Sequence, residues 1–185
     1  DYRGPIVVNQ EDNIDFSGRT RIPSPFAIRD HRSTHPALGS VSQLRELIKT
    51  IQQYGLKVVL DFVPNHRSLK HPWVSRRREL FASDSSGNLI AEFSRDVVKL
   101  DYNRPQTRQE MIKTLQLIQS WGADGVRCDM AQLIPLDFWQ EAIQTLNQDQ
   151  TFTFLAEVYP ESPFDLKLYQ DFIKTGFAVG DFHYL

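Results

Sequence analysis

The chain has 185 residues, 41% of them hydrophobic, so it can bury one sizeable core, and this composition excludes a disordered or fibrous protein. Its 21 Lys and Arg nearly balance 23 Asp and Glu, and the net charge of −2 argues against nucleic acid or an anionic membrane as a partner. The single cysteine, Cys128, excludes an internal disulfide and a cysteine-rich zinc site. No apolar run reaches the roughly 20 residues that span a bilayer, and no secretory leader is visible, which favours a cytoplasmic protein without establishing its compartment. Nothing in the composition indicates the oligomeric state.

The first 40 residues carry no regular pattern, because Gly and Pro interrupt every periodic run. A helix is predicted over 41–54, where Ser40 and Gln43 fit a capping box, apolar residues recur at helical spacing and a glycine follows. The next segment, 56–63, is a short apolar run rich in β-branched residues and ended by a proline. This pattern is typical of a buried parallel strand.

Residues 67–103 are more polar and lie where a simple strand-to-helix connection needs only a few residues, so we predict a functional insertion there. Regular alternation of strand and helix patterns follows it. The predicted helices cover about 105–120, 136–147 and 163–174, and the predicted strands cover about 124–129, 152–157 and 177–184. Ser162 as N-cap and Pro163 at the first helical position favour the start of the last helix.

Repeated strand–helix–strand units with right-handed crossovers leave two α/β architectures, an open doubly wound sheet and a closed (β/α)8 TIM barrel. Neither GxGxxG nor GxxxxGK[ST] occurs in the sequence, which weakens the case for a nucleotide-binding doubly wound fold. A whole barrel typically needs about 250 residues. We therefore expect residues 1–185 to be a segment of one (β/α)8 domain, with strands two to six visible and a short inserted loop at 67–103.

Charged and polar side chains lie at the ends of three successive predicted strands. They are Asp61, Asn65 and His66 at the first strand, Arg127 and Asp129 at the second, and Glu157 at the third. Parallel strands end on one face of an α/β fold, and that face holds the active site. We therefore expect these side chains to lie together at one rim.

Each of these residues also has an ordinary structural explanation. A carboxylate after a strand can cap the next helix, His66 can be a buried structural histidine, and two opposite charges can form a buried ion pair. Asp129 and Glu157 are separated from the following helix starts, and Asp137 fits the capping role better at the helix over 136–147. All the charges together are therefore better explained by a functional site.

Carboxylates at the ends of neighbouring parallel strands, which lie about 4.8 Å apart, suit retaining glycoside hydrolysis. That reaction needs two carboxyl groups about 5–5.5 Å apart, one ionised and one protonated. Arg127 precedes Asp129 by two residues on the same strand face, so we predict that it keeps Asp129 ionised. Glu157, farther from the guanidinium, would hold its proton.

Three segments, 61–66 (DFVPNH), 125–129 (GVRCD) and 154–157 (FLAE), resemble signature blocks of the α-amylase family, glycoside hydrolase family 13. Their order and spacing match those of the family. The insertion at 67–103 falls where the family carries its domain B. The resemblance covers the chain from about Ser24 onward.

The resemblance implies a retaining glycoside hydrolase or transglycosylase that acts on α-linked glucans or oligosaccharides, with Asp129 as nucleophile and Glu157 as acid/base. The implied substrate-binding residues are His66, Arg127, Phe26, Asp61 and Tyr159. Asn65 matches a position that binds calcium in many relatives, and calcium is the one cofactor that the resemblance suggests.

The chain departs from the family pattern at several positions. The family's third carboxylate, an Asp after a His on the seventh strand, has no counterpart here. Phe26 and His31 stand where relatives have Tyr, and Gln132 and Leu133 replace a Lys-His pair, which puts calcium and the usual subsite contacts in doubt. The alternative function is a non-catalytic relative that binds carbohydrate or assembles with a partner. The two retained carboxylates and their arginine favour the enzyme.

Overall fold

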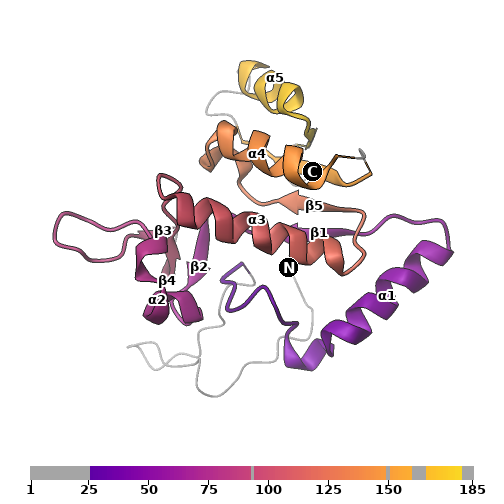
Figure 1. Cartoon of the computed structure of the whole chain (residues 1–185), viewed down its shortest axis with the longest axis horizontal. Helices are drawn as coiled ribbons and strands as arrows, with labels where there is room; N and C mark the ends of the chain where they lie inside the picture. Colours follow the sequence, from indigo (N-terminus) through magenta and orange to yellow (C-terminus); the bar gives the residue numbers. More distant parts are fainter. Residues whose placement is uncertain (1–25, 93, 149–150, 160–165, 181–185) are drawn as a thin grey trace.

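The computed structural model describes residues 26–92, 94–148, 151–159 and 166–180. It contains a parallel sheet with the strand order β1-β5-β6-β7 and an antiparallel sheet with the order β2-β4-β3 (Figure 1). The parallel strands are β1 (Val59–Phe62), β5 (Gly125–Cys128), β6 (Thr153–Glu157) and β7 (Ala178–Gly180). The antiparallel strands are β2 (His66–Ser68), β3 (Ala91–Glu92) and β4 (Ser94–Lys99).

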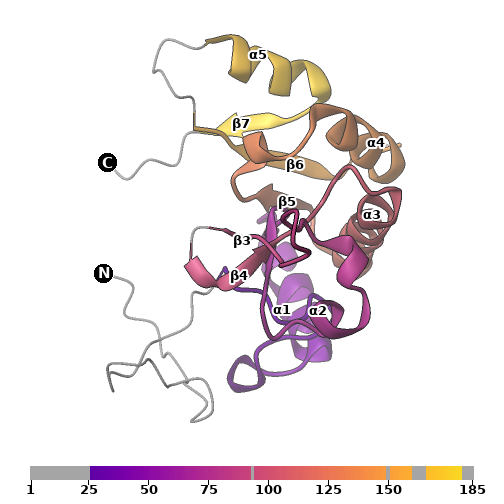
Figure 2. The ribbon, with the colours of Figure 1, turned by 90° about the vertical axis from the view of Figure 1, so that its left-hand side faces the viewer.

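Three helices follow the strands of the parallel sheet and lie along one of its faces (Figure 2). They are α3 (Pro105–Ser120), α4 (Leu136–Leu146) and α5 (Leu166–Thr175). The remaining helices are α1 (Val41–Gln53) and α2 (Pro72–Arg76), with short 3-10 turns η2 (Pro36–Leu38), η3 (Arg78–Leu80) and η4 (Ala131–Leu133). Within the described ranges, no helix has the length and apolar character needed to cross a bilayer.

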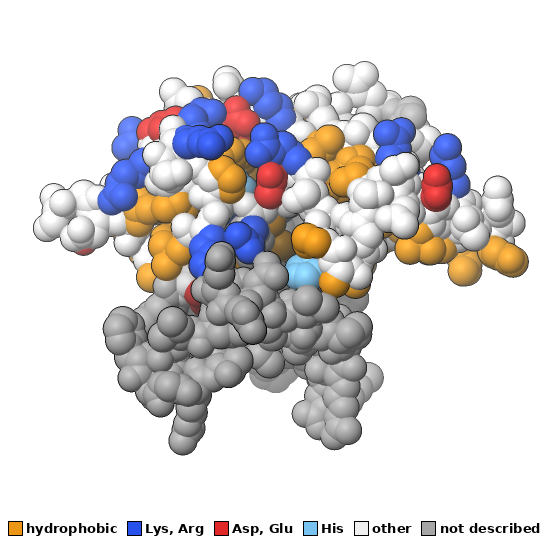
Figure 3. Space-filling view, turned by 90° about the horizontal axis from the view of Figure 1, so that it is seen from below, with side chains coloured by type: hydrophobic (Ala, Val, Ile, Leu, Met, Phe, Trp, Pro, Cys, Tyr) orange, Lys and Arg blue, Asp and Glu red, His pale blue; other side chains and the backbone are white. Residues whose placement is uncertain are grey.

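The predicted helix over 41–54 is confirmed as α1, and its capping box is formed. The Ser40 side chain accepts a hydrogen bond from the Gln43 amide at 3.3 Å, and the Ser40 amide donates to the Gln43 side chain at 2.8 Å. Ile48 is the buried residue of α1. Apolar side chains are exposed at the α1 end of the molecule (Figure 3), where Leu47 and Tyr54 are 55% and 80% exposed.

The other predicted elements are confirmed within a few residues where the structure describes them. Predicted helices over 105–120 and 136–147 appear as α3 and α4, and the predicted strands appear as β1, β5, β6 and β7. The expected start of α5 at Ser162 and Pro163 lies outside the described residues, as do residues 1–25 and the end of the last predicted strand.

Two details of the sequence interpretation are wrong. The segment predicted as a buried strand is buried only at its end, where Phe62 is fully enclosed, whereas Val59 is 41% exposed. The reason is that β1 is an edge strand among the described residues. Asp137 does not cap α4, because Pro135 is the N-cap and no side chain bonds there. Asp137 instead forms an exposed ion pair with Arg108 at 2.9 Å.

The order of the parallel strands follows the order of the chain without reversal. A doubly wound sheet reverses its strand order at a switch point and carries helices on both faces, and the described part of the chain shows neither feature. These two observations argue against a doubly wound sheet, which was the alternative fold that the sequence left open.

Gly125 permits the close approach of β5 to β6, because a Cβ there would lie 2.3 Å from the Thr153 carbonyl oxygen.

The hydrophobic core lies between the parallel sheet and helices α3–α5, and Trp139 of α4 is central to it. Its fully buried ring packs against Phe62, Phe138 and Phe177 at centroid distances of 6.4, 5.2 and 5.1 Å. Burial of such a ring contributes about 3 kcal/mol. The Trp139 indole N–H also donates to the Ala131 carbonyl at 3.1 Å, so the core fixes the loop that follows β5.

The polar insertion at 67–103 holds most of the antiparallel sheet, which the sequence did not predict. In the β2–β4 ladder His66 lies opposite Lys99, and the Leu100 amide donates to the Asn65 carbonyl at 3.0 Å. This pairing begins directly after the end of β1. The assignment of 67–103 as a domain-B-like unit stays a prediction.

Candidate active site

The register of the parallel sheet gathers the predicted charges on one face at the carboxyl ends of the strands. Arg127 pairs in register with Asp61 on one side and with Leu155 on the other. Asp129 and Glu157 each come two residues after a member of that row, and residues two apart on a strand point to the same face. The structure therefore brings Asp61, Arg127, Asp129 and Glu157 together.

Arg127 lies at the centre of this group and contacts all three carboxylates. Its Nη1 is 2.9 Å from Asp61 Oδ1 and 3.1 Å from Asp129 Oδ1, and its Nη2 is 2.5 Å from Glu157 Oε1. The Asp129 and Glu157 residues are 8% and 4% exposed, whereas the Asp61 side chain is about half exposed. A planar guanidinium with several donors suits this task, because it can hold several carboxylates at fixed angles.

Glu157 receives more hydrogen bonds than Asp129 does. The Met130 amide donates to Glu157 Oε2 at 2.9 Å, and the Tyr159 hydroxyl donates to Glu157 Oε1 together with Arg127. Burial raises the pKa of Glu157, but these donors outweigh burial and lower it below the usual value.

Asp129 responds in the opposite direction. Burial raises the pKa of Asp129 to about 7, the attraction of Arg127 opposes this shift, and repulsion by Glu157 and Asp61 adds to it. Asp129 and Glu157 lie close enough to titrate as a pair. Between the lowered pKa of Glu157 and about pH 7, the pair holds one proton, mainly on Asp129.

This distribution corrects the prediction that Arg127 keeps Asp129 ionised while Glu157 stays protonated. The prediction rested on Arg127 and Asp129 sharing a strand. In the structure the guanidinium reaches across to β6 and lies nearer to Glu157, by 2.5 against 3.1 Å. The sequence therefore predicted which carboxylates and arginine lie together, but it placed the shared proton on the wrong carboxylate.

Phe26 and His66 lie beside the charged group. The Arg127 guanidinium carbon is 5.8 Å from the centroid of the Phe26 ring, which is 38% exposed. The buried His66 side chain is hydrogen-bonded to the Phe26 backbone, and burial lowers the pKa of His66, so its imidazole is neutral near pH 7. The structure thus places a partly exposed aromatic ring beside the Arg127 guanidinium, and a histidine binds the backbone of the same residue.

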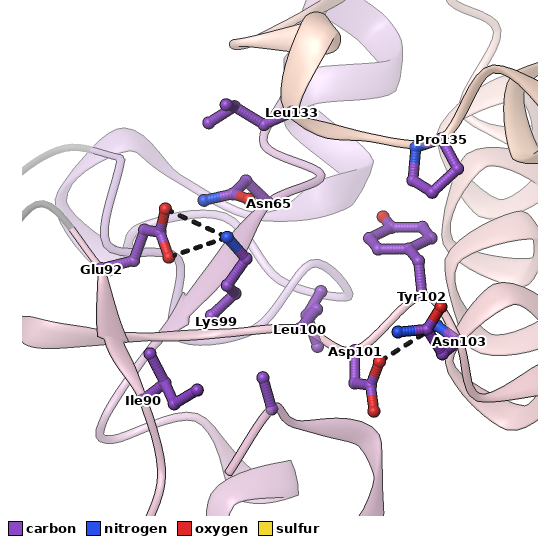
Figure 4. Close-up of a pocket in the computed structure, with 11 residues that line it drawn as sticks. Asn65, Ile90, Glu92, Lys99, Leu100, Asp101, Tyr102, Asn103, Leu133 and Pro135 are labelled. Atoms are coloured by element: carbon purple, nitrogen blue, oxygen red, sulfur yellow. Dashed lines mark hydrogen bonds and ion pairs between the residues drawn. The ribbon is translucent and has the colours of Figure 1, made fainter. Parts of the chain in front are cut away.

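Asn65 does not join the carboxylate group. It lies in a neighbouring cavity of about 360 Å³, between the antiparallel sheet and the loops that follow β1 and β5 (Figure 4). The cavity is lined by Asn65, Glu92, Lys99, Asp101, Tyr102 and Leu133, among others. In the described ranges no group of three or more His, Cys, Asp or Glu side chains is arranged to hold a metal ion.

The structure identifies two site residues that the sequence did not. Met130 has a left-handed backbone (φ 49°), the one non-glycine residue with positive φ in the described ranges, and its amide binds Glu157. The fully buried Arg67 donates from Nη1 to the Val63 and His66 carbonyls, both at 2.6 Å, and thereby fixes the chain after β1. Neither role has a sequence signal, because both depend on backbone conformation.

Comparison with known protein families places these features in context. Residues 4–88 match the family model "Alpha amylase, catalytic domain", a range that includes Asp61 and His66 but ends before Asp129. The chain is 29% identical over 153 residues to the alpha-1,4-glucan:maltose-1-phosphate maltosyltransferase of Rhodospirillum rubrum, covering 76% of this chain and 22% of that protein. A stretch of 53 residues is 38% identical to the mouse amino acid transporter heavy chain SLC3A1, covering 29% of this chain and 8% of that protein.

Solved structures of α-amylases also resemble this chain. The crystal structure of an alpha-amylase from Lactobacillus plantarum superposes with a TM-score of 0.73 at 29% identity, covering 92% of this chain and 39% of that one. The chain therefore spans well under half the length of the proteins it matches.

Proposed function

We propose that the chain, which matches the α-amylase catalytic domain over residues 4–88, carries the catalytic centre of a retaining glycosidase or transglycosylase acting on α-linked glucans or oligosaccharides. The observation that carries this proposal is the grouping of Asp129 and Glu157 around Arg127 at the ends of two adjacent parallel strands. Relatives named for glucan chemistry support it.

In the proposed reaction Asp129 attacks the anomeric carbon and forms a glycosyl ester, while Glu157 protonates the departing glycosidic oxygen. Glu157 then removes a proton from water or from an acceptor sugar hydroxyl, whose oxygen displaces Asp129. Hydrolysis and transfer differ only in that acceptor.

Between the lowered pKa of Glu157 and about pH 7, the carboxylate pair holds one proton, which is the number that this reaction needs. In the sugar-free site that proton resides mainly on Asp129, so substrate must favour its transfer to Glu157. Positive charge developing at the anomeric carbon stabilises an ionised Asp129, and a glycosidic oxygen beside Glu157 accepts a hydrogen bond from its protonated form. Binding of the sugar would thus produce the reactive arrangement.

The surrounding residues suit a sugar. The exposed Phe26 ring offers a face for stacking, and the neutral His66 and the half-exposed Asp61 offer hydrogen bonds to hydroxyl groups. Tyr159, which binds Glu157, would lie at the edge of the same subsite. We propose all four as substrate-binding residues.

We further propose that the parallel sheet is part of a (β/α)8 barrel and that 67–103 corresponds to a short domain B. The unreversed strand order and the helices on one face support the barrel. The exposed apolar side chains of α1, such as Leu47, would then face further barrel elements.

The decisive experiment compares Asp129→Asn and Glu157→Gln in the intact protein on an α-glucan and on a glycosyl fluoride. Asp129→Asn should be inactive on both substrates, because an amide does not form the ester. Glu157→Gln should be inactive on the glucan yet form the ester from the fluoride, whose leaving group needs no proton. Azide should accelerate breakdown of that ester, since an anionic nucleophile needs no general base.

Three outcomes would contradict the proposal in different ways. Azide rescue of Asp129→Asn with retained product, together with rescue of Glu157→Gln with inverted product, would reverse the two roles, because inversion marks the variant that lacks the nucleophile. Full activity in both variants would show that these carboxylates are not the catalytic groups. No glucan turnover by the unmodified protein would favour the second candidate, a non-catalytic binding or assembly protein. The observation that supports this second candidate is the 53-residue match to an amino acid transporter heavy chain. Asp137→Asn, at an exposed carboxylate on α4, is the matched control.

A further inference from the structure

The cavity that contains Asn65 already holds a positive charge. We infer that the Lys99 ammonium, held by Glu92, takes the place of the calcium ion that the family resemblance implies at Asn65, so that the protein binds no calcium there. Lys99 Nζ lies 3.3 and 3.2 Å from the two carboxylate oxygens of Glu92, and Figure 4 shows both side chains pointing into the cavity.

The side chains that line this cavity do not form a suitable set of calcium ligands, because calcium takes six to eight oxygen ligands at about 2.3–2.6 Å. Both oxygens of Glu92 face one ammonium group. The other lining carboxylate, Asp101, accepts hydrogen bonds from the Asn103 amide at 3.0 Å and from Arg104 Nε at 3.2 Å. The neutral oxygen ligands in the lining are the side chains of Asn65, Asn103 and Tyr102, and the Tyr102 hydroxyl already donates to the Pro64 carbonyl at 2.9 Å. Leu133 and Pro135 add apolar walls.

The position of Lys99 is set by the backbone. In the antiparallel ladder Lys99 lies opposite His66, and the Leu100 amide bonds to the Asn65 carbonyl at 3.0 Å. The β2–β4 pairing therefore keeps the Lys99 backbone beside Asn65, and the contact with Glu92 holds its side chain at the cavity. A divalent cation entering beside it would be repelled by the ammonium and would have to compete with it for Glu92.

The ion pair also has a structural role. It links β3 to β4 at the cavity wall, next to the loop that leads from β1 into the antiparallel sheet. The Lys99 and Glu92 side chains are 37% and 17% exposed, so the pair is partly shielded from solvent and is worth more than a fully exposed one. The internal cation thus does what a bound metal would otherwise do, which is to hold the insertion against the strand ends.

The test uses the intact protein and two lysines, with Lys113 as the matched control. Lys113 also binds a glutamate, Glu110, at 3.0 Å, but it lies on the exposed face of α3. The variants Lys99→Met, Lys99→Asp, Lys113→Met and Lys113→Asp are melted in EDTA and in excess calcium chloride. Bound calcium per chain is measured after equilibrium dialysis.

The unmodified protein should bind no calcium at this cavity and have the same Tm in EDTA and in calcium. Lys99→Met should lower Tm by about 2–4 °C in both solutions, whereas Lys113→Met should change it less. Lys99→Asp adds a carboxylate beside Glu92 and Asp101, so its Tm should be low in EDTA and rise with calcium. Neither Lys113 variant should respond to calcium.

Three results would overturn the inference. The first is a calcium ion bound by the unmodified protein and lost in Asn65→Ala. The second is a Lys99→Met variant as stable as Lys113→Met, which would show that the ion pair holds nothing. The third is a Lys99→Asp variant indifferent to calcium, which would show that this cavity is not a cation position. None of these results depends on glycosidase activity.

Discussion

Arg127 Nη2 lies 2.5 Å from Glu157 Oε1, so the guanidinium of β5 reaches across to the neighbouring strand β6. Its Nη1 meanwhile contacts Asp61 and Asp129 on its other side. One planar cation therefore sets the relative positions of the two proposed catalytic carboxylates. It also influences both of their pKa values, so its geometry matters as much as its charge.

Replacement of this arginine by lysine tests the geometry. Arg127→Lys keeps the positive charge but offers one point charge in place of a fork, so it cannot bind Asp61, Asp129 and Glu157 together. We expect kcat/KM on an α-glucan to fall about 100-fold or more, the scale of losing one preorganised donor. Arg108→Lys, at a partly buried arginine that binds the exposed Asp137 carboxylate, should change activity little. Equal activity of Arg127→Lys and the unmodified protein would show that only the charge matters.

The pH dependence of activity should reflect the single shared proton. Burial first, and then repulsion from the other carboxylates, raises the pKa of Asp129 to about 7, so above that pH both carboxylates are ionised and no general acid remains. We expect kcat/KM to decline as pH rises through about 7. A profile that stays flat to pH 9 would show that the pair keeps its proton or does not need one.

A nearby charge should move this alkaline limb in a defined direction. Asp61 raises the pKa of Asp129 by repulsion and also shares the Arg127 guanidinium. Asp61→Asn should therefore shift the alkaline limb of the kcat/KM profile to lower pH. Loss of substrate contacts to Asp61 would lower kcat/KM by the same factor at every pH and would not shift the limb. Asp137→Asn, which removes a distant exposed carboxylate, should leave the limb in place.

The rim of charges could be predicted from the sequence because strand ends and the two-residue alternation are local properties. Asp61, Arg127, Asp129 and Glu157 follow from that pattern alone. The position of the proton could not be predicted, because it depends on how far one guanidinium extends across a strand gap. The pairing of Lys99 opposite His66 could not be predicted from the sequence either, because antiparallel register depends on contacts between residues that are distant in sequence.

Stability should also depend on pH through Asp129. Its folded pKa of about 7 is above the value near 3.9 of an unfolded Asp, so the folded state holds a proton that the unfolded state has lost between these pH values. The contribution of Asp129 is thus fully present below about pH 4 and lost as pH rises to about 7. This difference of about three between the two pKa values corresponds to about 4 kcal/mol, which solvent screening reduces to on the order of 2 kcal/mol. Asp129→Asn should therefore be more stable than the unmodified protein by this amount at pH 8 and should gain little at pH 4. Denaturant unfolding at both pH values measures this, and a larger gain at pH 4 would give the wrong sign.

Met130 offers a test of how the backbone itself positions Glu157. Its left-handed conformation (φ 49°, ψ 44°) costs about 1 kcal/mol for a residue with a side chain and is free of cost for glycine. Met130→Gly should therefore keep the amide at Glu157 and retain activity within a few-fold, with the relieved strain offset by greater chain entropy in the unfolded state. Met130→Val should lose activity at least 10-fold, because a β-branched residue strongly disfavours this conformation and would displace the amide.

The comparison between the two variants separates backbone from side chain. Both remove the Met130 side chain, so any effect of the thioether is common to them and cancels in the ratio of their activities. Leu133→Val, in the same loop but without positive φ, controls for the general tolerance of this segment to a β-branched residue. If Met130→Val is as active as Met130→Gly, the amide does not position Glu157. If both are inactive and Leu133→Val is not, the Met130 side chain itself is needed at the site.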